Sequence, residues 1–302
     1  MIKFFKKIVL TIVVVAVVFV AYRYYKGEEL PTVEEIKQWG DTAGDKVQQE
    51  LEKVDYQIES NTIFAEDREF LEGNGEKITL GGEVSKLSVE VGGFAFQIKS
   101  SEDDEYHIQA DGNGKIQAYI EGDTLYVKAV RTVSDQKDSL SSKIYLYAPE
   151  KVQYDEVTGK LGAGQIDLSD LSAKQMKLEV GAGQIKGNGN SVEEMDLEVG
   201  MGAATFADAV VQQLDAKVGM GAVQIFGDIQ QTADLECSMG TMELKLAGEE
   251  KDFNYDLEGA AGNFIIGDEK YTGLTQELNL YNGAVKNIDI ECAVGSVAVA
   301  FE

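Results

Sequence analysis

A glycine recurs with a fixed spacing through the second half of the chain. Gly164, Gly183, Gly202, Gly221 and Gly240 follow one another at a constant interval of nineteen, which then widens to twenty-two at Gly262 and thirty-three at Gly295. The residues that lead up to each glycine are similar, as in Leu197-Glu-Val-Gly-Met-Gly202 and Leu235-Glu-Cys-Ser-Met-Gly240. A sequence period of about 20 residues is typical of stacked repeat architectures and not of a single globular core.

Within each repeat the apolar residues follow the pattern of two short strands. Apolar side chains occupy the fifth, third and first places before the glycine and the second and fourth places after it. In the repeat of Gly221 these residues are Ala216, Val218, Met220, Val223 and Ile225. Alternation with a period of two indicates half-buried strands. Because the alternation changes phase at the glycine, we expect a bend with dihedral angles that only glycine adopts without steric cost.

Each repeat is therefore expected to form one turn of a solenoid. Nineteen residues at about 3.3 Å each give a perimeter of about 63 Å, and no repeat shows the 3.6-residue period of a helix. The predicted fold class is all-β: a β-solenoid, or single-stranded β-helix-like stack of rungs about 19 residues long. We assign it to residues 77–302, with 84–148 as its irregular beginning and 59–76 as a linker.

The N-terminal region has the features of a membrane anchor. Residues 8–22 form an uncharged apolar run, and with the flanking aromatic residues 4, 5, 24 and 25 it spans about 33 Å as a helix. Three lysines precede the run, which places the N-terminus in the cytoplasm by the positive-inside tendency. We predict a cytoplasmic tip and single transmembrane helix in residues 1–26. A cleaved signal peptide is the alternative, but Phe19 stands where a small residue is required before the cleavage site.

Residues 27–58 are predicted to contain a juxtamembrane amphipathic helix. Pro31 and Thr32 mark its start, and one apolar stripe comprises Val33, Ile36, Trp39, Ala43, Val47, Leu51 and Val54. The stripe is explained either by packing against the solenoid or by self-association or contact with a partner in the membrane.

The charge of the chain is strongly negative and patterned. Residues 1–26 contain five of the 27 basic residues and no acidic residue, so the remainder has 22 basic and 53 acidic residues, a formal charge of −31. This excess argues against nucleic-acid binding, which requires a basic surface. Two places, the sixth and the fourth before each glycine, are repeatedly acidic: Asp196, Asp215, Asp234, Asp256 and Asp289 at the sixth, and Glu179, Glu198, Glu236, Glu258 and Glu291 at the fourth.

Both acidic places point outward in the predicted strands, so stacked rungs about 4.8 Å apart should carry two columns of carboxylates on one face. Like charges at that spacing repel unless they are neutralised, and Lys177 and Lys217 relieve this repulsion only in part. Two interpretations follow: a solvated, salt-screened face, or a ladder that binds a divalent cation such as calcium or a cationic partner. No other cofactor is indicated.

The two cysteines occupy equivalent inward places. Cys237 and Cys292 each stand three residues before a repeat glycine, with at least the rung of Gly262 between them in sequence. That rung should separate the cysteines by about 9–10 Å or more, which is too far for a disulfide. We predict two free, buried thiols.

Catalytic motifs are weak. The repeated Gly-x-Gly pairs lack the third glycine of a dinucleotide fingerprint, and His107 is the only histidine, which excludes histidine-rich metal sites and disfavours a Ser-His-Asp triad. Carboxylate pairs occur along the whole ladder and therefore mark no particular site of polysaccharide cleavage. We therefore expect that the protein is not an enzyme.

The chain resembles the bacterial putative-adhesin domain family of unknown function, which includes LiaG-like membrane-anchored envelope proteins of Gram-positive bacteria. The resemblance rests on Lys143-Ile-Tyr-Leu-Tyr-Ala-Pro149 and on the Gly-x-Gly rungs between Val157 and Phe301, and it covers residues 75–302. It implies a fold, an envelope location and a role in adhesion or envelope stress, and it transfers no catalytic residues.

These observations favour a non-catalytic, membrane-anchored extracytoplasmic protein at the cell membrane that acts as an adhesin or binding scaffold for an envelope protein or polymer. The alternative is a regulatory accessory of a cell-envelope stress response, and a polysaccharide-active β-helix enzyme comes third. The C-terminal strand, with Val297, Val299 and Phe301 alternating inward, lacks a polar cap. As an unpaired last rung it is an association hazard, so end-to-end homo-association is possible.

Overall fold

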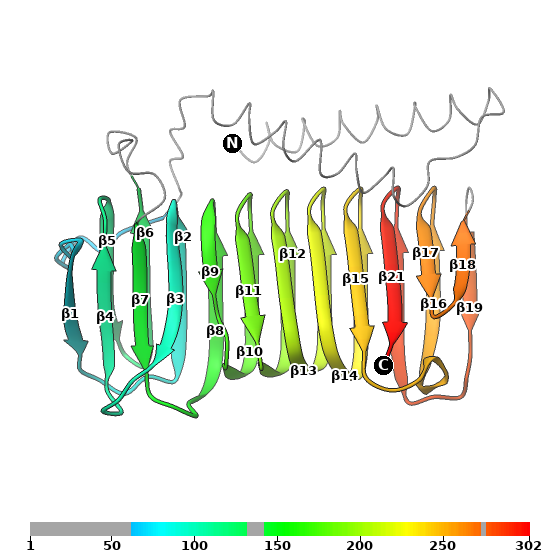
Figure 1. Ribbon diagram of the computed structural model, residues 1–302, viewed down its shortest axis with the longest axis horizontal. Helices are drawn as coiled ribbons and strands as arrows, with labels where there is room; N and C mark the ends of the chain where they lie inside the picture. Colours follow the sequence, from blue (N-terminus) through cyan, green and yellow to red (C-terminus); the bar gives the residue numbers. More distant parts are fainter. Residues whose placement is uncertain (1–61, 132–141, 273–275) are drawn as a thin grey trace, which may run out of the picture.

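Two walls of hydrogen-bonded β-strands face each other along the length of the molecule (Figure 1). This is a computed structural model that describes residues 62–131, 142–272 and 276–302. In the central repeats, a strand of the first wall turns at a corner into a strand of the second wall, and a short turn leads to the next rung. Leu178 pairs in parallel with Leu197, and Leu197 with Ala216, so equivalent places of successive repeats lie side by side. The predicted all-β, solenoid-like stack is confirmed.

The order of strands along each wall follows from the pairing. The first wall contains β5 (Lys115–Glu121), β6 (Thr124–Val130), β2 (Lys86–Gly92), β8 (Gln153–Leu161), β10 (Ser172–Val180), β12 (Ser191–Val199), the second halves of β13 (Ala203–Val218) and β14 (Ala222–Cys237), β20 (Lys286–Cys292), β16 (Phe253–Gly259) and β19 (Gln276–Leu280). The second wall contains β1 (Asn74–Leu80), β4 (Tyr106–Asp111), β7 (Lys143–Ala148), β3 (Phe94–Ser100), β9 (Gly164–Asp167), β11 (Gln184–Asn188), the first halves of β13 and β14, β15 (Thr241–Leu246), β21 (Ser296–Phe301), β17 (Asn263–Ile266) and β18 (Glu269–Thr272).

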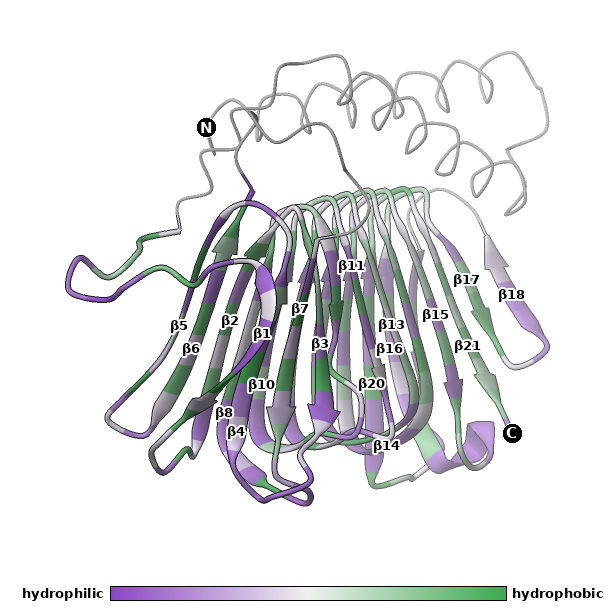
Figure 2. Ribbon diagram, turned by 60° about the vertical axis from the view of Figure 1, so that its left-hand side comes forward, coloured by the Kyte–Doolittle hydropathy of each residue, from purple (hydrophilic) through white to green (hydrophobic). Residues whose placement is uncertain are grey.

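The core lies between the two walls and consists of the inward side chains of every rung. Leu178 and Val180 are buried, and on the second wall so is Ile185. Figure 2 shows the resulting alternation of hydrophobic and hydrophilic residues along the strands. The first place before the glycine is the exception. Ala182 is exposed and Met220 is only half-buried, so the expectation that this place faces the core was wrong.

The repeat glycines permit close stacking of the corners. A Cβ atom at Gly221 would overlap the carbonyl oxygen of Gly202, which accepts a hydrogen bond from the backbone of Ala222. Gly202, Gly240 and Gly295 approach the preceding corner in the same way. Of the seven predicted corner glycines, Gly164 alone has a positive φ, of 107°. The prediction of dihedral angles special to glycine was therefore wrong for the others. At those corners glycine is required because there is no space for a side chain.

The rungs do not stack in chain order toward either end of the molecule. Strands β2 and β3 insert between the rung of β6 and β7 and the rung of β8 and β9. Strands β20 and β21 likewise insert between the rung of β14 and β15 and the rung of β16 and β17. Between β15 and β16 the chain passes through a 3-10 turn, η2 (Glu250–Asp252), and skips the position in the stack that β20 and β21 occupy.

This order corrects the predicted separation of the two cysteine rungs and the expectation that the C-terminal strand ends the stack. The rung of Gly295 stacks directly on that of Gly240, and the rung of Gly262 lies beyond it. The C-terminal strand β21 is an interior strand with a partner on each side, so it offers no open edge for end-to-end association. The edges of the described stack are antiparallel strands instead: β5 and β1 at one end, β19 and β18 at the other (Figure 1).

The predicted membrane anchor and juxtamembrane helix lie outside the described residues. Within residues 62–131, 142–272 and 276–302, no helix has the length and apolar character needed to cross a bilayer. The first regular element, β1, begins at Asn74.

Candidate functional site

Parallel register aligns the predicted acidic residues into two columns on the outside of the first wall. The aspartate column runs Asp196, Asp215, Asp234, Asp289, Asp256, in that stacking order, and the glutamate column includes Glu179, Glu198, Lys217, Glu236, Glu291, Glu258 and Glu277. All of these acidic side chains are exposed except that of Asp215, which is half-buried. Because β20 is inserted between β14 and β16, Asp289 lies between Asp234 and Asp256 in the stack. Glu291 lies in the same way between Glu236 and Glu258.

Lysines neutralise the columns toward the N-terminal end of the stack. Lys160 lies 2.8 Å from Glu179, and Lys217 lies 2.6 Å from Glu236 and 3.5 Å from Asp215. Further along, the rungs of β14, β20 and β16 carry six carboxylates that we call the acidic row: Asp234, Glu236, Asp289, Glu291, Asp256 and Glu258. Among the described residues, Lys217 is the only cation that forms an ion pair with the acidic row. The row is therefore a concentrated negative surface.

Asp289 lies at the centre of the acidic row and is repelled from both sides. Partial burial, followed by the neighbouring carboxylates of Asp234 and Asp256, raises the pKa of Asp289 above its ordinary value. A hollow of about 300 Å³ adjoins it and is lined by Asn254, Tyr255, Asp256, Asn279, Leu280, Tyr281, Asn287 and Asp289. Tyr281 is 84% exposed at this hollow, so an aromatic ring and two carboxylates are available to a ligand at the same place.

Replacing Asp289 with asparagine is expected to raise the melting temperature at pH 7. Because its folded-state pKa lies above the unfolded value, protonation of Asp289 stabilises the fold; that contribution is complete below the ordinary value of 3.8 and is lost as the pH rises through the folded pKa. The gain from Asp289→Asn should therefore shrink when melting is measured at successively lower pH. Asp196→Asn, in the same column beside Lys177, is the matched control. A gain that does not change between pH 7 and pH 4 would contradict the assignment.

The acidic row is a line of charges and not a cage for an ion. Within the part of the chain that the structure describes, one group brings three metal-ligating atoms within 4.8 Å of one another: Asp103, Glu105 and His107. This group lies at the N-terminal end of the stack, where β3 leads into β4. This group was not predicted from the sequence, although its three residues alternate along one short segment.

The contacts of His107 indicate a structural role for this group. Its Nε2 lies 2.7 Å from an Asp103 carboxylate oxygen and its Nδ1 lies 3.0 Å from the Thr79 hydroxyl, so both ring nitrogens are engaged. The Ser101 hydroxyl also donates to Asp103. The hydrogen bonds from His107 and Ser101 hold the pKa of Asp103 below its ordinary value. Together these contacts tie the loop before β4 to the edge strand β1.

Cys237 and Cys292 lie directly beside each other across β14 and β20. They are paired residues in the parallel register, both are buried, and both are free thiols. The prediction of free, buried thiols is confirmed, while the predicted separation by a whole rung was wrong because β20 occupies the adjacent position. The hydrogen bond with Cys292, followed by burial, raises the pKa of the Cys237 thiol, which makes this sulfur a poor nucleophile.

A two-walled parallel stack with glycine corners and an acidic outer face defines a solenoid-like domain. The chain belongs to the Toastrack DUF4097 family, whose pattern matches residues 132–299. The expected kinship with putative-adhesin domains of unknown function is confirmed. Comparison with curated protein sequences finds no match.

Solved structures with a similar arrangement include three bacterial proteins. A putative adhesin from Bacteroides fragilis is 14% identical, with coverage of 75% of this chain and 98% of that one and a TM-score of 0.41. A putative cell adhesion protein from Clostridium sporogenes is 14% identical, with coverage of 78% and 98% and a TM-score of 0.32. A putative adhesin from Parabacteroides distasonis is 12% identical, with coverage of 75% and 98% and a TM-score of 0.36. At this level of identity the likeness concerns the fold alone.

Proposed function

We propose that this chain is a non-catalytic adhesin or binding scaffold of the cell envelope. In this proposal residues 1–26 anchor it in the cell membrane with the N-terminus inside, and the stack is displayed outside the cell. The acidic row binds a positively charged partner, either an envelope protein or an amine-bearing polymer. The observation that carries the proposal is the stacking of six carboxylates over three adjacent rungs, with one lysine paired to them among the described residues.

The fold concentrates negative charge in the acidic row without neutralising it. Adjacent rungs hold their carboxylates about 4.8 Å apart, and the parallel ladder prevents them from moving away from one another. A ligand with several positive charges would relieve this repulsion at many points at once. Such binding weakens as salt is added, because the charges are exposed and screened. A rigid wall also loses little conformational entropy when it binds a ligand.

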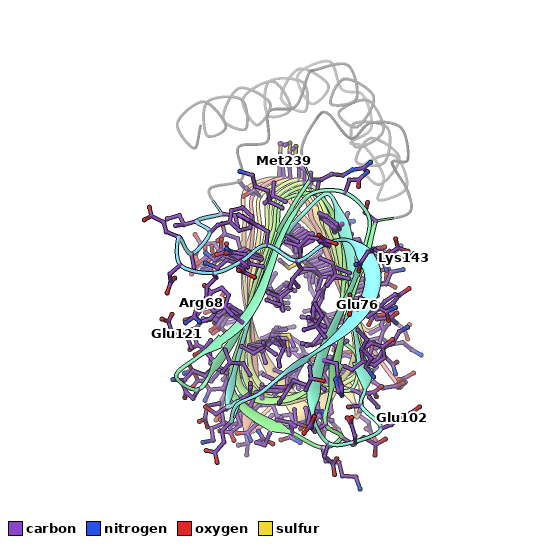
Figure 3. All side chains as sticks on the ribbon, turned by 90° about the vertical axis from the view of Figure 1, so that its left-hand side faces the viewer. Arg68, Glu76, Glu102, Glu121, Lys143 and Met239 are labelled. Carbon is purple, nitrogen blue, oxygen red and sulfur yellow. The ribbon has the colours of Figure 1, made fainter. Side chains whose placement is uncertain are left out.

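Neutralising the centre of the acidic row tests whether the row binds a positively charged partner. The full chain is placed in nanodiscs of neutral lipid, and its binding to isolated envelope fractions is measured as a function of salt. The triple variant Asp234→Asn, Asp289→Asn, Asp256→Asn should lose most of the binding. The matched control, Glu76→Gln, Glu102→Gln, Glu121→Gln, removes the same charge at the other end of the stack, where Figure 3 shows these residues. Equal binding by both variants would refute the assignment.

Calcium is expected to stabilise the acidic row. Hard divalent cations prefer carboxylate oxygens, and their binding to the folded state alone raises its stability. Millimolar calcium should therefore raise the melting temperature of the full chain, and the triple asparagine variant should show little or no increase. An unchanged melting temperature in the wild-type chain would exclude a cation ladder, while leaving the binding of a cationic polymer open to the experiment above.

The predicted topology is tested by protease accessibility in intact cells. Protease added outside should digest the stack while an epitope fused before Met1 remains protected, because residues 8–22 would separate the two. Digestion of both parts, or release of the protein by alkaline carbonate, would contradict a single-pass anchor with an internal N-terminus.

A further inference from the structure

The corners of the solenoid carry an apolar ridge that the acidic row does not involve. It consists of the residue between the two glycine places of each corner, in stacking order Ala163, Ala182, Met201, Met220, Met239, Val294 and Ala261. Backbone hydrogen bonds connect each corner to the next, including Met220 to Gly200, Met239 to Gly219 and Val294 to Ser238. We call this strip the corner ridge.

The side chains of the corner ridge point away from the core. Figure 3 shows Met239 at the edge of the stack, with its side chain directed outward. The alanine at position 182 is exposed and the methionines are half-buried. Glycines flank Met201 and Met220 on both sides, so no neighbouring side chain within the corner covers them. Three consecutive methionines on a surface otherwise rich in carboxylates form an adaptable apolar strip, because the methionine side chain is flexible and polarizable.

One segment of this chain matches the corner ridge in length and chemistry. The seven ridge residues occupy rungs about 4.8 Å apart, so the ridge is about 29 Å long. The apolar stripe predicted for residues 33–54 is about 32 Å long at 1.5 Å per residue. Both are continuous lines of uncharged residues, and packing an amphipathic helix on an apolar strip is a common recognition mode.

The described chain begins beside the N-terminal end of the corner ridge. The carbonyl oxygen of Ile63 accepts a hydrogen bond of 2.7 Å from Lys128 on β6. That strand ends at the corner edge, where Arg131 donates its backbone N–H to Gly92 on the neighbouring rung, and Gly93 of that rung donates in turn to Ala163. Seven residues separate position 54 from position 62, enough to cover about 25 Å. A helix that ends near this point can therefore run back along the ridge.

We infer that residues 32–55 form an amphipathic helix that docks along the corner ridge, with its apolar stripe on Met201, Met220 and Met239. The C-terminal end of the helix lies at the N-terminal end of the stack, and its N-terminal end lies toward Val294 and Ala261. Docking fixes the orientation of the stack relative to the residues that precede the helix.

The only tryptophan of the chain, Trp39, lies in the apolar stripe and reports on docking. The full chain is studied in nanodiscs of zwitterionic lipid, and quenching of Trp39 fluorescence by acrylamide is measured. The double variant Met201→Glu, Met220→Glu should increase the quenching constant several-fold and shift the emission to longer wavelength. Val210→Glu is the control, because Val210 is an apolar side chain with 37% exposure that lies outside the ridge.

A reciprocal variant protects the test from misfolding of the stack. Val47→Glu leaves every described residue unchanged and should expose Trp39 as the ridge variant does. Equal quenching in the wild-type chain and both variants would overturn the inference. Two further results would assign the stripe to another occupant and also overturn it: protection of Trp39 that depends on protein concentration, which indicates a second copy, and quenching of Trp39 by brominated lipid, which indicates the bilayer.

Discussion

Ending the chain after Val285 is expected to unfold the C-terminal part of the stack and not merely to shorten it. The truncation removes β20 and β21, whose inward residues Ile288, Ile290, Cys292, Val297 and Val299 are each at most 2% exposed. Burial of such side chains contributes about 1.5–3 kcal/mol each, which together is comparable with the whole stability of a domain, about 5–15 kcal/mol. The loss also separates β14 and β15 from β16 and β17.

Urea denaturation followed by circular dichroism measures this effect. The truncated chain should show a lower midpoint and a smaller slope, since less surface remains to be exposed. Single substitutions provide a matched comparison. Ile290→Ala, in an interior strand, should cost about 2–5 kcal/mol. Leu278→Ala, in the edge strand β19, should cost less because that residue is only partly buried. A truncated chain with the wild-type midpoint and slope would show that the last rung is not interior.

A methyl group at the second glycine of a corner is expected to destabilise the stack far more than one at the first. At Gly221 the added Cβ would overlap the Gly202 carbonyl oxygen, which is held in place by its hydrogen bond to Ala222. The rungs would have to separate, so Gly221→Ala should cost about 3 kcal/mol, at the upper end of typical overpacking penalties. At Gly219 the nearest atom would be 3.0 Å away, and Gly219→Ala should cost about 1 kcal/mol or less.

The sequence itself supports this contrast. Ser238 and Ala293 occupy the place of Gly219 in later corners, whereas the place of Gly221 is a glycine in each predicted corner. Thermal melting of the two alanine variants, measured side by side, gives the comparison. Equal melting temperatures would mean that the corners have more freedom than the backbone approach indicates.

The repeat could be predicted from the sequence because each rung carries its own alternation and its own glycine. The order of the last two rungs could not be predicted from spacing, because a parallel ladder is selected by side-chain fit and not by chain order. A signal was nevertheless present. Cys292 matches Cys237 at the same place in the repeat, whereas the rung of Gly262 has Gly259 there, and the two cysteines are neighbours in the structure.

The corner residues show a second limit of pattern reading. Ala182 and Met220 continue the alternation of Leu178 and Val218 in sequence, yet they face outward because the bend begins one residue before the repeat glycine. The columns of carboxylates were predictable from the period, but their merging into the acidic row depended on the rung order. The hydrogen-bonded group around His107 could not be predicted because it depends on the pairing of β1 with β4. This pairing lies outside the repeats and places Thr79 opposite His107.

Because antiparallel strands form both ends of the described stack, the parallel repeats between them can be lengthened from within. Residues added after Glu302 would not extend the ladder, since β21 is interior and the edges belong to β1, β5, β18 and β19. Duplicating one repeat unit between β10 and β14 would insert a rung that contacts only its two neighbours. Each duplication would lengthen the protein by about 4.8 Å. Relatives of different reach can thus arise by internal duplication, with the two end structures unchanged.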